Sequence, residues 1–96
     1  MDRKFVDSQF TGKLELESDE GGKHKLFWVK EGDTKITRTQ IPRGKEYKEL
    51  GEEILSRIAH QLYLTLSELK DALNCPMPEE KFHEIVSQRH RERYRR

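Results

Sequence analysis

Two kinds of apolar periodicity divide this chain into a strand-forming first half and a helical second half. From Lys13 to Glu17 apolar and charged residues alternate strictly, which is typical of a strand with one buried face. Residues 23–30 and 34–40 are dense in Val, Ile, Thr, Phe and Trp, which favours strands. Because only short polar segments that contain glycine separate these stretches, we predict a three-stranded antiparallel meander with strands at about 13–17, 23–30 and 34–40.

In the second half of the chain the apolar residues recur at intervals of three and four, which is the period of an amphipathic helix. The pattern predicts a helix over 45–62, followed by shorter helices over 67–73 and 79–87. Thr65 and Ser67 are candidate N-caps of the second of these helices. Two prolines separate the last two helices, because proline lacks the amide hydrogen that a helix interior needs.

The two ends of the chain carry weaker patterns. Residues 1–11 hold scattered apolar groups and predict an irregular lead-in, and residues 87–96 hold almost nothing apolar and predict a basic, frayed tail. We therefore predict one α+β domain over 12–86, in which the three-stranded antiparallel sheet is followed by two or three helices packed on one face. A chain of 96 residues fits one such domain with a thin core.

The net charge of +1 conceals a separation of charge along the chain. Residues 23–48 carry eight Lys or Arg against three acids, whereas residues 1–22 and 49–86 are acidic. Alternation along the strands would put several basic side chains on one face, where they could bind the phosphates of a nucleic acid. The alternative is an ordinary solvated sheet edge, whose lysines only oppose aggregation. The candidate nucleic-acid-binding residues are Lys23, Lys25, Lys35, Arg38, Arg43 and Lys45.

His24 is the candidate catalytic residue. It follows a glycine pair near the start of the second predicted strand, between Lys23 and Lys25. A histidine can donate or accept a proton near neutral pH without a metal. On RNA it could protonate the leaving 5′ oxygen while a 2′ hydroxyl attacks the phosphorus. The alternative is an exposed strand histidine without a chemical role.

Two aromatic residues are neighbours on the same predicted strand. Because successive side chains of a strand point to opposite faces, Phe27 and Trp28 cannot both face the core. One of them is expected in the core, and the other either packs as well or stacks on a nucleic-acid base.

The remaining residues indicate no further chemistry. The single cysteine cannot form an internal disulfide, and the four histidines and Cys75 match none of the usual spacings of metal ligands. We therefore expect neither a metal nor another cofactor. No apolar stretch approaches the roughly 18 residues of a membrane span, and the first residues are too polar for a signal peptide. We expect a cytoplasmic protein that does not contact a membrane.

One arrangement in the strand half is similar to that of a known family. Gly22-Lys23-His24-Lys25 leads into an apolar strand, and a glycine turn, a Thr-rich strand, Ile41-Pro42-Arg43-Gly44 and a helix follow. This arrangement resembles the HicA family of toxin–antitoxin messenger-RNA interferases, over roughly residues 12–62. The helical half from Leu50 to Phe82 also looks like that of small HicA-like proteins.

The resemblance implies a fold like that of the double-stranded-RNA-binding domain, with helices on one face of a three-stranded antiparallel sheet. It places the catalytic histidine of the family, part of a Gly-x-His element, at His24, with Gly22 as the glycine. It also implies a helix before the first strand, which residues 1–11 do not predict. Family members end soon after the second helix, whereas about 30 further residues follow here.

Two classes of function follow from these observations. The first is an RNA-binding domain that acts as a metal-independent ribonuclease through His24, with RNA and an antitoxin-like protein as partners. The second is a non-catalytic protein-interaction or regulatory module, in which the acidic helices and the basic tail contact a partner. Salt dependence distinguishes the two, because binding through phosphates weakens steeply as salt rises.

Overall fold

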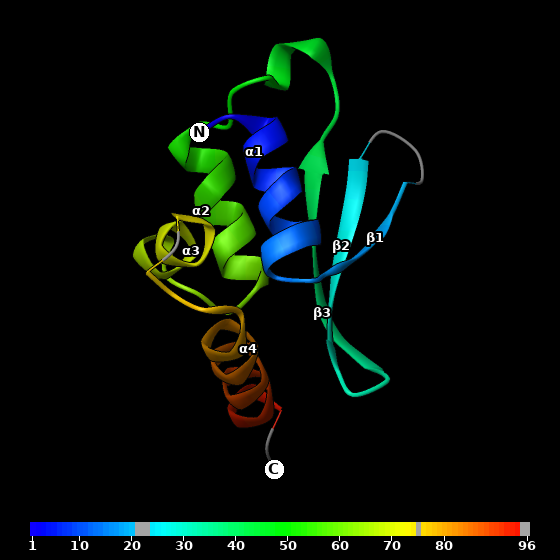
Figure 1. The fold of residues 1–96 in the computed structure, drawn as a ribbon, viewed down its shortest axis with the longest axis vertical. Coiled ribbons are helices and arrows are strands. Elements are labelled where there is room, and N and C mark those ends of the chain that lie inside the picture. The colour runs from blue at the N-terminus through cyan, green and yellow to red at the C-terminus, as the bar shows by residue number, and fades with distance from the viewer. Residues whose placement is uncertain (21–23, 75, 95–96) are drawn as a thin grey trace.

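A three-stranded antiparallel sheet and the helices against one of its faces form the protein, as the computed structural model shows (Figure 1). The structure describes residues 1–20, 24–74 and 76–94. The strand order is β1-β2-β3, so the α+β class and the antiparallel meander predicted from sequence are confirmed. The elements follow the order α1 (Arg3–Ser8), a π-helical turn (Gln9–Lys13), β1 (Glu17–Asp19), β2 (His24–Glu31), β3 (Thr34–Pro42), a 3₁₀ turn (Lys45–Tyr47), α2 (Glu52–Gln61), α3 (Leu66–Asn74) and α4 (Glu79–Arg93).

The hydrophobic core lies between the sheet and the helices. Phe27 and Val29 of β2 point into it and are fully buried, and α1 and α2 lie on that side of the sheet in Figure 1.

Two threonines of β3 attach the sheet to the end of α2. The hydroxyls of Thr37 and Thr39 donate hydrogen bonds to the backbone carbonyl and the side-chain Oε1 of Gln61, at 2.7 Å and 2.6 Å.

The irregular lead-in predicted for residues 1–11 is wrong, because α1 and the π-helical turn occupy most of it. Val6, Phe10 and Leu14 follow one another at intervals of four, and each has no exposed surface. Asp2 caps the helix by accepting a hydrogen bond from the amide of Lys4 at 2.8 Å. The N-terminal segment is therefore a core element of the fold.

The first strand begins later than predicted. Instead of residues 13–17, β1 spans Glu17–Asp19, and Glu15 adopts a positive φ of 52°. The amides of Leu14 and Leu16 donate to the carbonyls of Gln9 and Phe10. Both leucines are buried through this turn, so the alternating pattern reflects two leucines entering the core and not a continuous strand.

The long helix predicted over 45–62 is divided into the 3₁₀ turn and α2. Between them, the amide of Leu50 donates to the carbonyl of Met1 at 2.7 Å, and Glu49 forms a bridge with Asp2. Gly51, which disfavours a helix interior, precedes α2 in an extended conformation. Pairing with the N-terminal segment thus replaces the first turns of the predicted helix.

The last two helices agree more closely with their predicted positions. Thr65 caps α3 as proposed, because its hydroxyl accepts from the amide of Glu68 while the Glu68 carboxylate accepts from the amide of Thr65. In contrast, α4 continues to Arg93 instead of fraying after residue 87. Among the described residues, no helix is both long and apolar enough to cross a membrane.

Candidate nucleic-acid interface

The sheet face that points away from the core carries most of the predicted site. Residues directly opposite each other in antiparallel strands share a face, and Trp28 pairs with Arg38 of β3 and with Glu17 of β1. Because Phe27 and Val29 face the core, these side chains lie on the other side of the sheet. We call this surface the outer face; its members on β2 and β3 include His24, Leu26, Trp28, Lys35, Arg38 and Gln40.

Trp28 lies at the centre of a small cationic cluster on the outer face. The Lys35 ammonium lies 4.6 Å and the Arg38 guanidinium 5.4 Å from the centroid of the indole ring. Phe27 is the aromatic residue in the core, and Trp28 is only half-buried. The indole Nε1 is buried and has no hydrogen-bond partner among the described residues. The ring, rather than the N–H group, is therefore the part of Trp28 that a ligand could contact.

His24 lies at the other end of the outer face. It is exposed and pairs with Pro42 across the sheet. It lines a shallow hollow of about 470 Å³ together with Arg43 and Tyr47. An imidazole in such an open position can exchange a proton with a bound ligand, and the neighbouring guanidinium can hold an anion.

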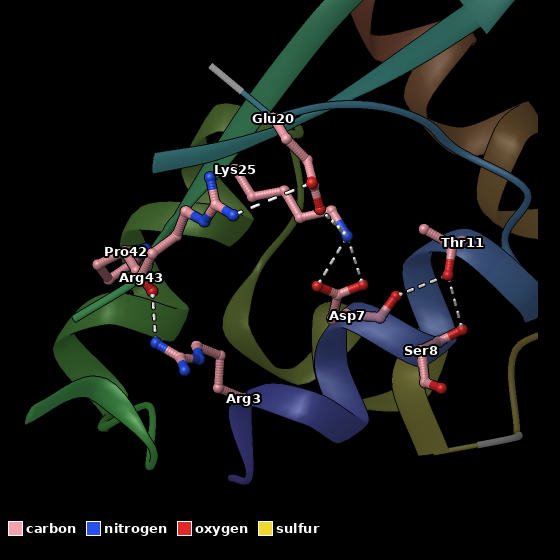
Figure 2. A network of polar contacts seen from close by, with 8 residues as sticks. All are labelled: Arg3, Asp7, Ser8, Thr11, Glu20, Lys25, Pro42 and Arg43. Carbon is pink, nitrogen blue, oxygen red and sulfur yellow. Dashed lines mark hydrogen bonds and ion pairs between the residues drawn. The ribbon is translucent and has the colours of Figure 1, made fainter. Parts of the chain in front are cut away.

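Lys25 points to the opposite face from His24 and contacts acids of two other segments (Figure 2). Its ammonium lies 3.1 Å from both carboxylate oxygens of Asp7 and 3.3 Å from Glu20. Burial acts to lower the pKa of Lys25, but the hydrogen bonds that its ammonium donates to Asp7 and Glu20 outweigh this effect and hold the pKa above its usual value. The ion pair with Asp7 links β2 to α1. Because only 17% of its side chain is exposed, Lys25 is poorly placed to bind phosphate.

Arg43 occupies the corner between β3 and the 3₁₀ turn, where Figure 2 shows it beside Glu20. Its guanidinium lies 3.9 Å from that carboxylate, and 43% of the side chain is exposed. Arg3 supports the corner by donating to the carbonyls of Pro42 and Gly44 at 3.3 Å and 2.9 Å. Arg43 is thus held in a fixed corner and retains an exposed guanidinium edge.

The other predicted basic residues differ in how far their charge is offset. Lys35 lies 3.7 Å from Glu17, which also pairs with Lys30 at 3.1 Å. Hydrogen bonding to Lys30, with the charges of both lysines, holds the pKa of Glu17 below its usual value. Arg38 has no acidic partner among the described residues. Lys23 lies outside the described residues, and of Lys45 only the backbone is described, in the 3₁₀ turn.

The structure therefore brings together part of the predicted site and separates another part from it. Lys35 and Arg38 lie around Trp28, and His24 and Arg43 lie at the far end of the same sheet, whereas Lys25 faces inward. Sequence reasoning did not assign Trp28 to the site. The alternation of strand side chains showed that Phe27 and Trp28 take different faces, but not which of them is buried.

No family model, no curated protein and no solved structure matches the chain. Within residues 1–20, 24–74 and 76–94, no three His, Cys, Asp or Glu side chains are grouped so that they could hold a metal ion. The outer face, with an aromatic ring between two cations, is the surface whose chemistry is most informative about function.

Proposed function

We propose that the protein binds single-stranded RNA across the outer face of its sheet. The observation that carries this proposal is the half-buried indole of Trp28, flanked by Lys35 at 4.6 Å and Arg38 at 5.4 Å. Proteins bind single strands by stacking bases on aromatic side chains while cationic groups follow the phosphates. Stacking on one aromatic ring contributes about 1–3 kcal/mol per base.

The order of the elements supports the same proposal. A helix, three antiparallel strands and a further helix follow one another from α1 to α2. This order, including the helix before the first strand, is what the HicA resemblance implies for a fold like the double-stranded-RNA-binding domain. The resemblance is an argument from fold, so the side chains of the outer face must carry the function.

RNA cleavage is the catalytic extension of this proposal, with His24 as the proton-transfer group. His24 and Trp28 are four residues apart on β2 and lie on the same face, which corresponds to about 13 Å along the strand. A strand of RNA stacked on Trp28 and lying along β2 would reach the hollow beside His24. Its imidazole would accept the proton of a 2′ hydroxyl or protonate the leaving 5′ oxygen, and Arg43 would hold the phosphate.

Substitutions on the outer face test the binding proposal directly. We expect Trp28→Leu to weaken the binding of a fluorescein-labelled 12-nucleotide single-stranded RNA about tenfold in fluorescence anisotropy, because a stacking platform is lost. Arg57, which is exposed on α2, offers the control Arg57→Gln. If Trp28→Leu and Arg57→Gln bind this RNA as tightly as the unaltered chain, the outer face is not the RNA site.

A further inference from the structure

A cleft lies beside β2, at the end of the sheet opposite His24. Its volume is about 790 Å³. One wall is formed by Leu16 and Glu17 with Trp28, Lys30 and Glu31 of β2, and the other by α4 residues including Glu79 and Glu84. The cleft adjoins the proposed RNA site, because Trp28 and Glu17 also line it, and from there it extends along the edge of β2 to α4.

The edge of β2 is unpaired where it borders the cleft. Residues Glu17–Asp19 of β1 pair with Leu26–Trp28, while β2 continues to Glu31 with β3 on its other side. On the β1 side, Val29, Lys30 and Glu31 therefore have no partner strand among the described residues. Unpaired edges of this kind accept an extended peptide as an additional strand, through backbone hydrogen bonds.

The charges in the cleft favour a basic occupant. Its two Lys or Arg side chains are already paired with acids: Lys30 lies 3.1 Å from Glu17, and Arg91 lies 2.5 Å from Glu31. Three further glutamates line the cleft and have no Lys or Arg partner among the described residues. They are Glu15, Glu79 and Glu84.

Glu15 and Glu79 lie close enough to affect each other. Hydrogen bonding with Glu15 raises the pKa of Glu79, and the small burial and the charge of Glu15 act in the same direction. Glu15 also adopts a positive φ of 52°, an uncommon conformation for a residue with a side chain. His83, on the same wall, donates from Nε2 to the carbonyl of Leu14 at 2.8 Å and lies 3.7 Å from Glu79. A Lys or Arg placed here would relieve the repulsion between the two carboxylates.

We infer that the cleft binds an extended basic peptide of a partner protein, which adds as a strand to β2 at Val29–Glu31. Alternate Lys or Arg side chains of this strand would contact Glu15, Glu79 and Glu84, because every second side chain of a strand points to the same side. RNA does not fit this site, since its phosphates would meet unpaired carboxylates. The inference does not depend on RNA binding by the outer face.

Synthetic peptides test both parts of the inference. The probe is a fluorescein-labelled ten-residue peptide in which arginine and threonine alternate, and the comparison peptide carries proline in place of every threonine. Both peptides have the same charge, but proline cannot supply the backbone hydrogen bonds of a strand. We expect the proline peptide to bind at least about tenfold more weakly, and amide resonances of Val29, Lys30 and Glu31 to shift with the threonine peptide.

Matched glutamine variants test the charge of the cleft. Glu79→Gln with Glu84→Gln should weaken binding of the arginine–threonine peptide about tenfold, as expected for two lost ion pairs. The control is Glu53→Gln with Glu80→Gln, which removes two exposed charges outside the cleft and includes the other acid in the first turn of α4. Three results would overturn the inference: no binding of the arginine–threonine peptide, equal binding of the two peptides, or equal losses in the two double variants.

Discussion

The contact between Arg89 and Glu68 illustrates how single residues stabilise this small fold. Arg89 donates to both carboxylate oxygens of Glu68, at 2.6 Å and 2.8 Å, and to the carbonyl of Tyr63 at 2.9 Å. The hydrogen bonds from Arg89, which outweigh the effect of burial, lower the pKa of Glu68 from its ordinary value of 4.5 to about 2. One bidentate pair therefore joins α4 to the first turn of α3.

The lowered pKa of Glu68 makes the free energy of unfolding depend on pH. Because the folded-state pKa lies below the unfolded value, this carboxylate stabilises the fold above about pH 4.5, and the contribution is lost as the pH falls toward 2. Because 39% of the Arg89 side chain is exposed and solvent screens the pair, we expect Arg89→Met to lower the free energy of unfolding at pH 7 by about 1–2 kcal/mol. The free energy of unfolding of this variant should also decrease less between pH 4.5 and pH 2. Urea unfolding at pH 7, 5 and 3 measures both effects.

Arg93→Met is the matched control for this experiment. Arg93 also lies on α4, and its guanidinium is 5.7 Å from the centroid of the Tyr63 ring. This exposed interaction is expected to contribute about 0.5 kcal/mol to the free energy of unfolding. Equal losses of stability in Arg89→Met and Arg93→Met at every pH would contradict the role assigned to the Arg89–Glu68 pair.

His24 carries the catalytic part of the proposal, and its substitution separates binding from chemistry. We expect His24→Ala to abolish cleavage of single-stranded RNA in the presence of EDTA and to change binding less than threefold, because His24 is exposed and lies about 13 Å from the stacking site. The measurement compares gel-resolved cleavage with anisotropy of the same RNA. Cleavage that persists in His24→Ala would exclude this histidine as the proton-transfer group. RNA that binds without being cleaved by either chain would leave the protein as an RNA-binding module.

Among the elements, α1 and the π-helical turn that follows it contribute more to the core than their sequence suggested. Phe10, in the turn that follows α1, is fully buried and lies 5.1 Å from the ring of Phe27. We expect Phe10→Ala to lower the free energy of unfolding by about 3–5 kcal/mol, as for other buried phenylalanines. Phe5 in α1 is 38% exposed, and Phe5→Ala should lower the free energy of unfolding by less than about 1 kcal/mol. Similar losses in the two variants would mean that the N-terminal segment does not pack as described.

The same segment shows what the sequence could and could not predict. The second and third strands were placed within a residue or two because their β-branched and aromatic residues agree with the alternation of buried positions. The interval of four between Val6, Phe10 and Leu14 was a helical signal, but three apolar residues form a weak pattern. The turn at Glu15 gave no signal, since no glycine marks its positive φ. Long-range pairing with Met1, which delays α2, cannot be inferred from local periodicity.

The candidate site was predictable to a similar extent. Basic residues on the strands were identified, but their partners depend on the tertiary structure: Asp7 approaches Lys25 only because α1 packs beside β2. The position of Trp28 between Lys35 and Arg38 depends on the register of β2 and β3, which shifts between Val29 and Lys30. Such an irregularity changes which side chains are neighbours and leaves no clear mark in the sequence.

At the scale of the whole molecule, charges that are separated along the sequence are brought together by folding. Acids of the first 20 residues pair with the basic strands: Asp7 and Glu20 with Lys25, and Glu17 with Lys30 and Lys35. The strongly basic sheet expected from the charge of residues 23–48 is therefore partly neutralised. Lys35, Arg38 and Arg43 remain exposed, and Arg38 has no acidic partner among the described residues.

This neutralisation limits how strongly RNA binding can depend on salt. If Lys35, Arg38 and Arg43 each contact one phosphate, the logarithm of the binding constant should fall with the logarithm of salt concentration with a slope of about −2. Anisotropy titrations of a single-stranded RNA between 50 and 300 mM salt, roughly the range in which phosphate contacts are sensitive, measure this slope. A slope steeper than about −4 would require that Lys25 and Lys30 also bind phosphate, contrary to their ion pairs with acids, of which Figure 2 shows those of Lys25.

The central claim is that a base stacks on Trp28, and the chain contains a single tryptophan to report it. The most direct measurement is therefore the intrinsic fluorescence of the unaltered protein during titration with unlabelled single-stranded RNA. We predict quenching of the Trp28 emission that saturates together with binding measured by anisotropy, at RNA concentrations raised severalfold by Arg38→Gln. RNA binding that leaves the emission of Trp28 unchanged, or no binding at low salt, would contradict the account.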